Sequence, residues 1–252
     1  MYGTQLPDKL KSDATDFVTA ALKSVCGVIP YAGSFFAEIV GAIIPQQRMD
    51  RIAQFVMELD LRIGDLEGGI IRSHLKDEEF TDLVEESIRQ VLRSTTDERR
   101  GYLASMISRS LTRDEVNHSE TKHLMRILGE LNDVEVVWLK NYQYPTMGGN
   151  RDFRSRHKEV LRHRIAVAGS STDELDQAAL QESYQNHLIS LGLLTGIVSR
   201  DIDGQTEFDQ FTGNLKISYY QTSPLGNLLL RTIGLSDSEE TKMRNKNVPG
   251  PE

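Results

Sequence analysis

The amino-acid sequence predicts a mainly α fold: a helical bundle with an apolar N-terminal helical hairpin, followed by a small α+β module near the C-terminal end. Three observations predict this fold class. Residues 17–44 are almost uncharged, apolar residues then recur at helical spacing as far as Tyr142, and strand-like alternation begins only after Gly192. With 252 residues and a hydrophobic content of 38%, the chain is long and apolar enough to bury a core.

The apolar stretch at 17–44 carries two formal charges, Lys23 and Glu38, and is interrupted once, around Pro30 and Gly33. This pattern predicts two short helices folded about a turn, each shorter than the roughly 20 apolar residues that a membrane-spanning helix needs. Two interpretations stay open: a hairpin buried in the core, or a hairpin that a trigger releases into a membrane, as in colicin-like pore formers. The residues concerned are Phe17, Val25, Pro30, Gly33, Phe35, Phe36, Val40 and Ile43.

A long helix is expected from about 47 to 76, because its apolar residues repeat every seven positions. Two such ladders form a candidate helix–helix interface, made of Ile52, Val56, Leu59, Ile63, Leu66 and Ile70. The interface would serve either self-association or packing within the chain.

Further helices are expected before residue 145. The acidic run 77–79 suits the start of one helix, and Thr95 and Glu98 have the spacing of a capping box for the next. Another helix is expected to begin near Ser119 and to break at Asn132–Asp133. The helical bundle, including the apolar hairpin, is therefore expected to span residues 1–145.

A basic connecting segment is expected at residues 146–171, after turn-rich residues that start at Tyr144. Its positively charged side chains are a candidate patch for an anionic partner: Arg151, Arg154, Arg156, Lys158, Arg162 and Arg164.

The last ordered module is expected at residues 172–235. A helix would begin at about Thr172, two strands would follow at 193–202 and 215–222, and a short helix would start at Pro224. This order resembles the C-terminal half of a winged-helix module. The polar tail at 236–252 is expected to be disordered.

Charge weighs against binding of nucleic acid by this module. The formal net charge is −8, and the helix before the two strands carries no Lys or Arg between residues 172 and 191. It carries four carboxylates, which would repel DNA phosphates: Asp173, Glu174, Asp176 and Glu182. A DNA-binding winged-helix regulator is therefore kept as the alternative function, with the basic segment as its contact region.

Signatures of catalysis are missing from the sequence. It contains no glycine-rich phosphate-binding loop and no zinc-type cluster of cysteine and histidine. The single cysteine, Cys26, has no partner for an internal disulfide. We therefore expect a non-enzymatic protein with no catalytic residues, no cofactor and no metal. Mixed charges before the apolar stretch are unlike a signal peptide, so a cytoplasmic location is expected.

Several segments together resemble a bacterial family associated with abortive infection, the alpha-type proteins of phage resistance. The similarity covers the apolar Gly/Pro segment with the long helix after it, and then Arg99–Ile107, Ile127–Leu139, Leu188–Leu194 and Thr222–Leu230. It implies a protein of antiviral defence and abortive infection that has no catalytic residues. Together with the apolar hairpin and the missing catalytic signatures, it predicts action through protein–protein contacts, with membrane disruption on triggering as an option. Another protein or a second copy is the expected partner; a membrane is a further option, and a small-molecule partner is left open.

The chain departs from that family in its long basic insert at 151–164.

Overall fold

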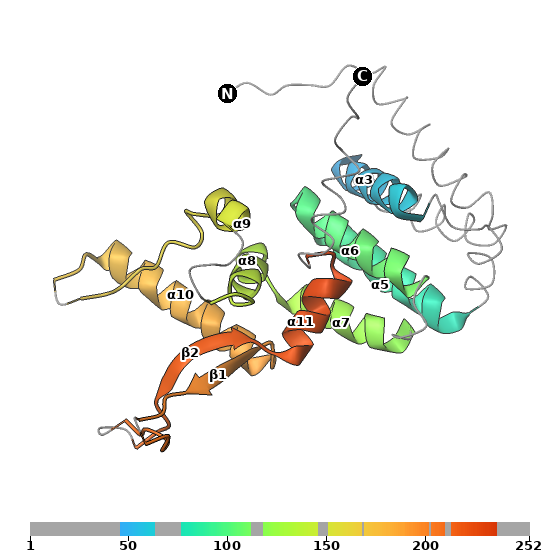
Figure 1. Cartoon of the computed structure of the whole chain (residues 1–252). Helices are drawn as coiled ribbons and strands as arrows, with labels where there is room; N and C mark the ends of the chain where they lie inside the picture. Colours follow the sequence, from blue (N-terminus) through green and yellow to red (C-terminus); the bar gives the residue numbers. More distant parts are fainter. Residues whose placement is uncertain are drawn as a thin grey trace, which may run out of the picture. The chain divides into compact units, whose positions relative to one another are not determined.

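The structure, a computed structural model, describes residues 46–63, 77–111, 118–145, 151–167, 169–201, 203–209 and 213–235. In these residues the chain is mainly helical with one two-stranded antiparallel sheet, so the predicted mainly α fold class is confirmed (Figure 1). Three predicted features lie outside the described residues: the apolar hairpin at 17–44, the ladder residues Leu66 and Ile70, and the tail at 236–252.

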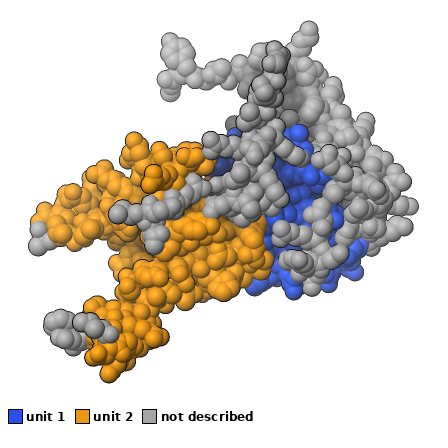
Figure 2. All heavy atoms as spheres, viewed as in Figure 1, with its two compact units in different colours: residues 1–129, 232–234 blue, residues 130–231, 235–252 orange. Residues whose placement is uncertain are grey.

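The chain divides into two compact units, which Figure 2 colours separately. Unit 1 comprises residues 1–129 and 232–234, and unit 2 comprises residues 130–231 and 235–252. The division falls at the end of a helix, well before the turn-rich segment that follows Tyr144.

Four described helices build unit 1. They are α3 (Gln46–Ile63), α5 (Glu78–Arg93), α6 (Asp97–Ser110) and α7 (His118–Glu130). Helix α3 packs against α6 and α5, and α5 also packs against α6.

The apolar ladder of α3 is buried. The four ladder residues that the structure describes are Ile52, Val56, Leu59 and Ile63, and each is less than a tenth exposed. Since α3 packs against two helices of its own unit, the chain itself supplies neighbours for α3.

Polar side chains connect the helices of unit 1. The Gln90 amide on α5 donates to the Met125 carbonyl of α7 at 2.9 Å, and Arg99 on α6 donates to the Leu128 carbonyl at 2.7 Å. The second bond satisfies the Leu128 carbonyl, one of the last four of α7, which have no partner within the helix.

Capping residues set the helix starts in unit 1, with one correction to the sequence-based expectation. Asp77 caps α5 as the acidic run predicts, by accepting from the Glu79 N–H at 2.9 Å. The predicted capping box of Thr95 and Glu98 is wrong, because the N-cap of α6 is the next residue, Thr96. The Thr96 hydroxyl accepts from the Arg99 N–H at 3.3 Å, and arginine cannot return the bond as a glutamate would.

Unit 2 combines the sheet with four helices. The elements are α8 (Asp133–Asn141), α9 (Arg151–Arg156), α10 (Thr172–Ser190), β1 (Leu194–Val198), β2 (Ile217–Thr222) and α11 (Pro224–Thr232), whose last residue is assigned to unit 1. The short helix α9 lies in the segment that sequence reasoning treats as a connection.

Local chemistry explains these elements. Asn132 and Ser171 each form a capping box, at the starts of α8 and α10, so the predicted break and the predicted helix start are both confirmed. The two predicted strands are present but shorter than expected. They pair from Leu194 with Thr222 outward, and two isolated bridges, Arg200 with Thr206 and Phe208 with Leu215, continue the hairpin.

Thr222 holds the end of the hairpin against α8. Its hydroxyl donates to the Leu139 carbonyl at 2.9 Å, and its backbone N–H donates to the Tyr142 carbonyl at 3.1 Å. Nearby, the Gln143 amide donates to the Asn227 side-chain oxygen at 3.0 Å, which adds α11 to the same cluster. The core of unit 2 therefore lies where α8, the hairpin and α11 meet.

No helix among the described residues is both long and apolar enough to cross a bilayer.

Candidate functional site

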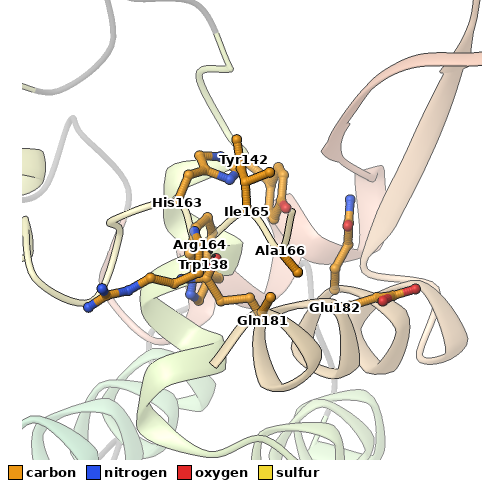
Figure 3. Close-up of a pocket in the computed structure, with 10 residues that line it drawn as sticks. Trp138, Tyr142, His163, Arg164, Ile165, Ala166, Gln181 and Glu182 are labelled. Atoms are coloured by element: carbon orange, nitrogen blue, oxygen red, sulfur yellow. Dashed lines mark hydrogen bonds between the residues drawn. The ribbon is translucent and has the colours of Figure 1, made fainter. Parts of the chain in front are cut away.

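Unit 2 contains a pocket of about 340 Å³ (Figure 3). Three segments form its walls: α8 and the residue after it, the extended chain at 163–166, and the middle of α10. The lining residues are Trp138, Tyr142, His163, Arg164, Ile165, Ala166, Ala178, Gln181, Glu182 and Gln185.

Gln181 on α10 positions the extended wall of this pocket. Its amide nitrogen donates to the Arg162 carbonyl at 2.6 Å, and its amide oxygen accepts from the Arg164 N–H at 2.9 Å. One side chain therefore pairs with the backbone as a neighbouring strand would. Because both the nitrogen and the oxygen of the Gln181 amide bond to this backbone, Gln181 holds the extended wall of the pocket in place.

Aromatic rings form another wall. The Trp138 ring centroid lies 5.9 Å from that of Tyr142 and 5.6 Å from that of His163, whose ring meets the indole edge-on. Trp138 is only 4% exposed, and its indole N–H is buried without a hydrogen-bond acceptor in the part of the chain that the structure describes. The wall thus contains an unpaired donor, which is uncommon in folded proteins.

Tyr142 keeps its proton in this environment. Burial of the ring raises the pKa of the Tyr142 hydroxyl, and the neighbouring Tyr220 phenol raises it further. At neutral pH the side chain is therefore an uncharged group that can both donate and accept a hydrogen bond.

The polar side chains at the mouth are not used by the fold. In the described residues, the side chains of Arg164, Glu182 and Gln185 form no hydrogen bond or ion pair. They add a cation, an anion and a neutral amide to the residues that line the pocket. This combination can bind a ligand that has both hydrogen-bonding edges and a charged group.

A side-chain contact between His187 and Glu135 connects α10 to α8. Glu135, 3% exposed, contacts the His187 Nδ1 atom through one carboxylate oxygen at 2.7 Å. Its other oxygen accepts from the Asn132 N–H at 2.8 Å, so the same carboxylate completes the capping box of α8.

The basic residues predicted as one anionic patch occupy different environments. Arg154 donates to the Asn141 side-chain oxygen at 3.1 Å and to the Tyr144 carbonyl at 2.7 Å, so it fastens α9 to the end of α8. Arg164 lines the pocket. The remaining members are exposed: Arg151, Arg156, Lys158 and Arg162.

The surface of α10 is unusually open for a helix of its length. Leu188 is its one buried residue, whereas Leu175 is 47% exposed and Leu180 is 53% exposed. The extended chain beside it exposes Ile165 and Val167 still further. Exposed apolar residues recur on the hairpin extension, where the bridge partners Phe208 and Leu215 are 60% and 50% exposed.

Sequence reasoning missed the pocket. Its walls come from residues far apart in the chain, and neither the helical periodicity of α10 nor the basic character of 151–164 indicates that they meet. The one local signal was the clustering of Trp138 and Tyr142 one helical turn apart, which places both rings on the same side of α8.

The described residues hold no cluster of His, Cys, Asp or Glu suited to a metal ion. Comparison of the chain with family models, curated proteins and solved structures finds no significant match.

Proposed function

We propose that this protein acts through protein–protein contacts in bacterial phage defence, in the cytoplasm and without catalysis. The resemblance to the alpha-type abortive-infection proteins supports the biological role. We further propose that residues 172–235 are a winged-helix-like module that serves as the contact surface. The order helix, hairpin, helix in α10, β1, β2 and α11 supports that assignment.

The observation that carries the proposal is the exposed surface of α10. Leu175 and Leu180 are about half exposed on a helix that also carries four exposed carboxylates and no Lys or Arg. A surface that mixes apolar and acidic side chains suits a protein partner with apolar and basic side chains.

The hairpin extension has the same chemistry. Phe208 and Leu215 are exposed as bridge partners, and two exposed acids accompany them, Asp201 and Asp203. A third acid, Glu207, is half-buried and pairs with Lys216 at 3.1 Å. In DNA-binding winged helices the helix before the hairpin enters the major groove, where carboxylates would face phosphates. Protein binding is therefore favoured over DNA binding.

Membrane disruption is the proposed effector step, and the apolar hairpin at 17–44 is the segment proposed to carry it. The support for this step is the sequence alone: small residues and few charges in two short apolar halves. A charged residue at its centre would oppose insertion into hydrocarbon.

The test is infection of a bacterial host that expresses the chain. Wild-type protein is expected to lower phage plating or to shorten host survival during infection, and Leu175→Ser with Leu180→Ser is expected to remove the effect. Gln177→Ala, an exposed polar change on the same helix, is the matched control and should retain it. If wild-type expression changes neither plating nor survival, the role in phage defence is rejected.

A second measurement tests the membrane step by itself. Purified wild-type protein is expected to release dye from liposomes under the triggering condition, and Val40→Asp is expected to prevent release. Protection from phage without any leakage would remove membrane disruption from the proposal and leave the contact function in place.

A further inference from the structure

The pocket in unit 2 has a chemical character that the proposed protein contacts do not use. The geometry points to a binding site for a planar nitrogen heterocycle that carries an anionic group, the class to which purine nucleotides belong. This inference stands independently of the proposed role in phage defence, since it rests on the pocket lining alone.

The aromatic wall matches a planar ligand. The ring centroids of Tyr142 and His163 each lie within 6 Å of the Trp138 ring centroid. A heterocycle can stack on the faces of such rings or meet their edges. Ala166 and Ala178 complete the lining with small side chains, which leave room for a flat ring. An aliphatic ligand would gain from burial alone, whereas a flat ring can in addition stack on these rings.

The edge of a nitrogen heterocycle presents donors and acceptors, and two free side chains complement them. Glu182 accepts hydrogen bonds, and Gln185 both donates and accepts. A carboxylate suits the adjacent ring N–H and amino group of guanine, whereas an amide suits the ring nitrogen and amino group of adenine. Since Gln181 is already bonded to the backbone on both sides, these two residues are the ones left to read the ring edge.

Arg164 supplies the charge for the anionic group. Its backbone N–H is held by Gln181, which fixes the segment, while its guanidinium forms no ion pair among the described residues. Guanidinium groups bind phosphate oxygens with two parallel hydrogen bonds. In a chain with a formal net charge of −8, a free cation beside an aromatic wall is a specific feature of this pocket.

The pocket size limits the ligand to one nucleotide. Its volume of about 340 Å³ lies near the lower end of the roughly 300–1,000 Å³ range for small-molecule sites. A polynucleotide would need a groove with several successive stacking platforms, whereas the described lining offers a single platform.

The chain provides its own reporter for the test. Trp138 is the only tryptophan, so intrinsic tryptophan fluorescence reads the pocket wall directly. The full-length protein is titrated with GMP, AMP, guanosine and a short single-stranded oligonucleotide, with free tryptophan amide as the correction for light absorbed by the ligands. GMP or AMP is expected to change the emission saturably, and GMP is expected to bind about tenfold more tightly than guanosine because Arg164 contacts its phosphate.

Two substitutions separate the parts of the site. Arg164→Met is expected to abolish the preference for GMP over guanosine. Glu182→Gln is expected to weaken the binding of GMP more than the binding of AMP. Arg162→Met and Asp176→Asn are the matched controls, since both are exposed, lie on the same two segments and do not line the pocket. Circular dichroism and Trp138 emission without ligand confirm that each variant is folded.

Several results would overturn the inference. One is the lack of a saturable change with any mononucleotide or nucleoside, and another is an equal loss of binding in the control variants. Binding of the oligonucleotide without binding of GMP or AMP would also overturn it, because that result would assign the aromatic wall to nucleic acid. Equal affinity for GMP and guanosine would remove the anionic group from the ligand class.

Discussion

The buried carboxylate of Glu135 and the imidazole of His187 lie 2.7 Å apart and join two helices that are distant in sequence. Glu135 also accepts from the Asn132 N–H, so one side chain both starts α8 and fixes α10 to it. The pocket wall depends on the same arrangement, because Trp138 comes from α8 and Gln181 from α10.

Glu135→Ala is therefore expected to destabilise unit 2 by about 1–3 kcal/mol, since it leaves the Asn132 N–H and the His187 ring without their Glu135 partner. Glu135→Gln retains an oxygen for the Asn132 N–H and should cost less. Urea unfolding followed by circular dichroism measures both changes. Equal stability of the alanine variant and wild-type would show that the pair contributes nothing to the fold.

Gly226 in α11 is expected to tolerate no side chain. A Cβ atom there would lie 2.4 Å from the Leu193 carbonyl oxygen and 2.7 Å from the Thr222 methyl carbon, both part of the junction between hairpin and helix. Gly226→Ala is expected to cost about 1–3 kcal/mol through this overlap, and thermal unfolding would measure the loss.

Gly101 is the matched control for that substitution, because it also lies within a helix but has room around it. The nearest side-chain atom to a Cβ at Gly101 is 3.8 Å away, on Arg62. Gly101→Ala is expected to stabilise the protein by about 0.5–1 kcal/mol through helix propensity. A loss of stability at Gly101 as large as that at Gly226 would contradict the packing argument.

The ion pair of Asp82 and Lys122 is expected to make a small pH-dependent contribution to the stability of unit 1. The Lys122 ammonium donates to the Asp82 carboxylate at 2.7 Å and, by this hydrogen bond first and by its charge second, lowers the pKa of Asp82. A lowered pKa in the folded state means that the stabilisation is present above the unfolded pKa of Asp82. It is lost as the pH falls through the folded value.

Asp82→Asn should therefore be less stable than wild-type at neutral pH, and the difference should vanish in acid below the folded pKa. Added salt should reduce the difference at neutral pH, because the pair is exposed to solvent. Denaturation at several pH values, with Lys122→Gln as the second arm of a double-mutant cycle, tests this. A difference that grows in acid would contradict the assignment.

The basic segment is expected not to support specific DNA binding. Arg156 and Arg162 are exposed, so they would contact phosphates if a duplex bound there, whereas Arg154 is engaged with Asn141 and Tyr144 and its loss would disturb α9. A gel-shift assay with wild-type protein is expected to show weak, strongly salt-dependent binding at most. Specific binding that Arg156→Ala and Arg162→Ala abolish would instead promote the DNA-binding regulator.

Local sequence signals predicted most of the described elements. Helices α8 and α10 begin at the N-caps Asn132 and Ser171, whose capping bonds involve residues only three positions away. Helix α11 begins with Pro224, a residue favoured at the first helical position. The predicted cap of α6 is one residue too early because two threonines stand in succession, and only the backbone conformation distinguishes Thr96 from Thr95.

The pocket lay beyond such reasoning for a physical reason. Trp138 and Glu182 are brought to one cavity by packing between segments that share no periodicity, and the bonds of Gln181 to the chain at Arg162 and Arg164 have no sequence signature. The basic residues illustrate the same limit. Their charge is visible in the sequence, but whether an arginine fastens a helix, as Arg154 does, or lines a cavity, as Arg164 does, depends on tertiary contacts.

The bonds of Gln181 also have a kinetic consequence. Because the backbone N–H of Arg164 is held by a side-chain amide, rotation of that single amide frees the proton for exchange with solvent and loosens one side of the cavity in the same event. The exchange rate at Arg164 therefore reports the population of the state in which this bond is open, and a bound molecule that closes the cavity would slow the exchange of that amide.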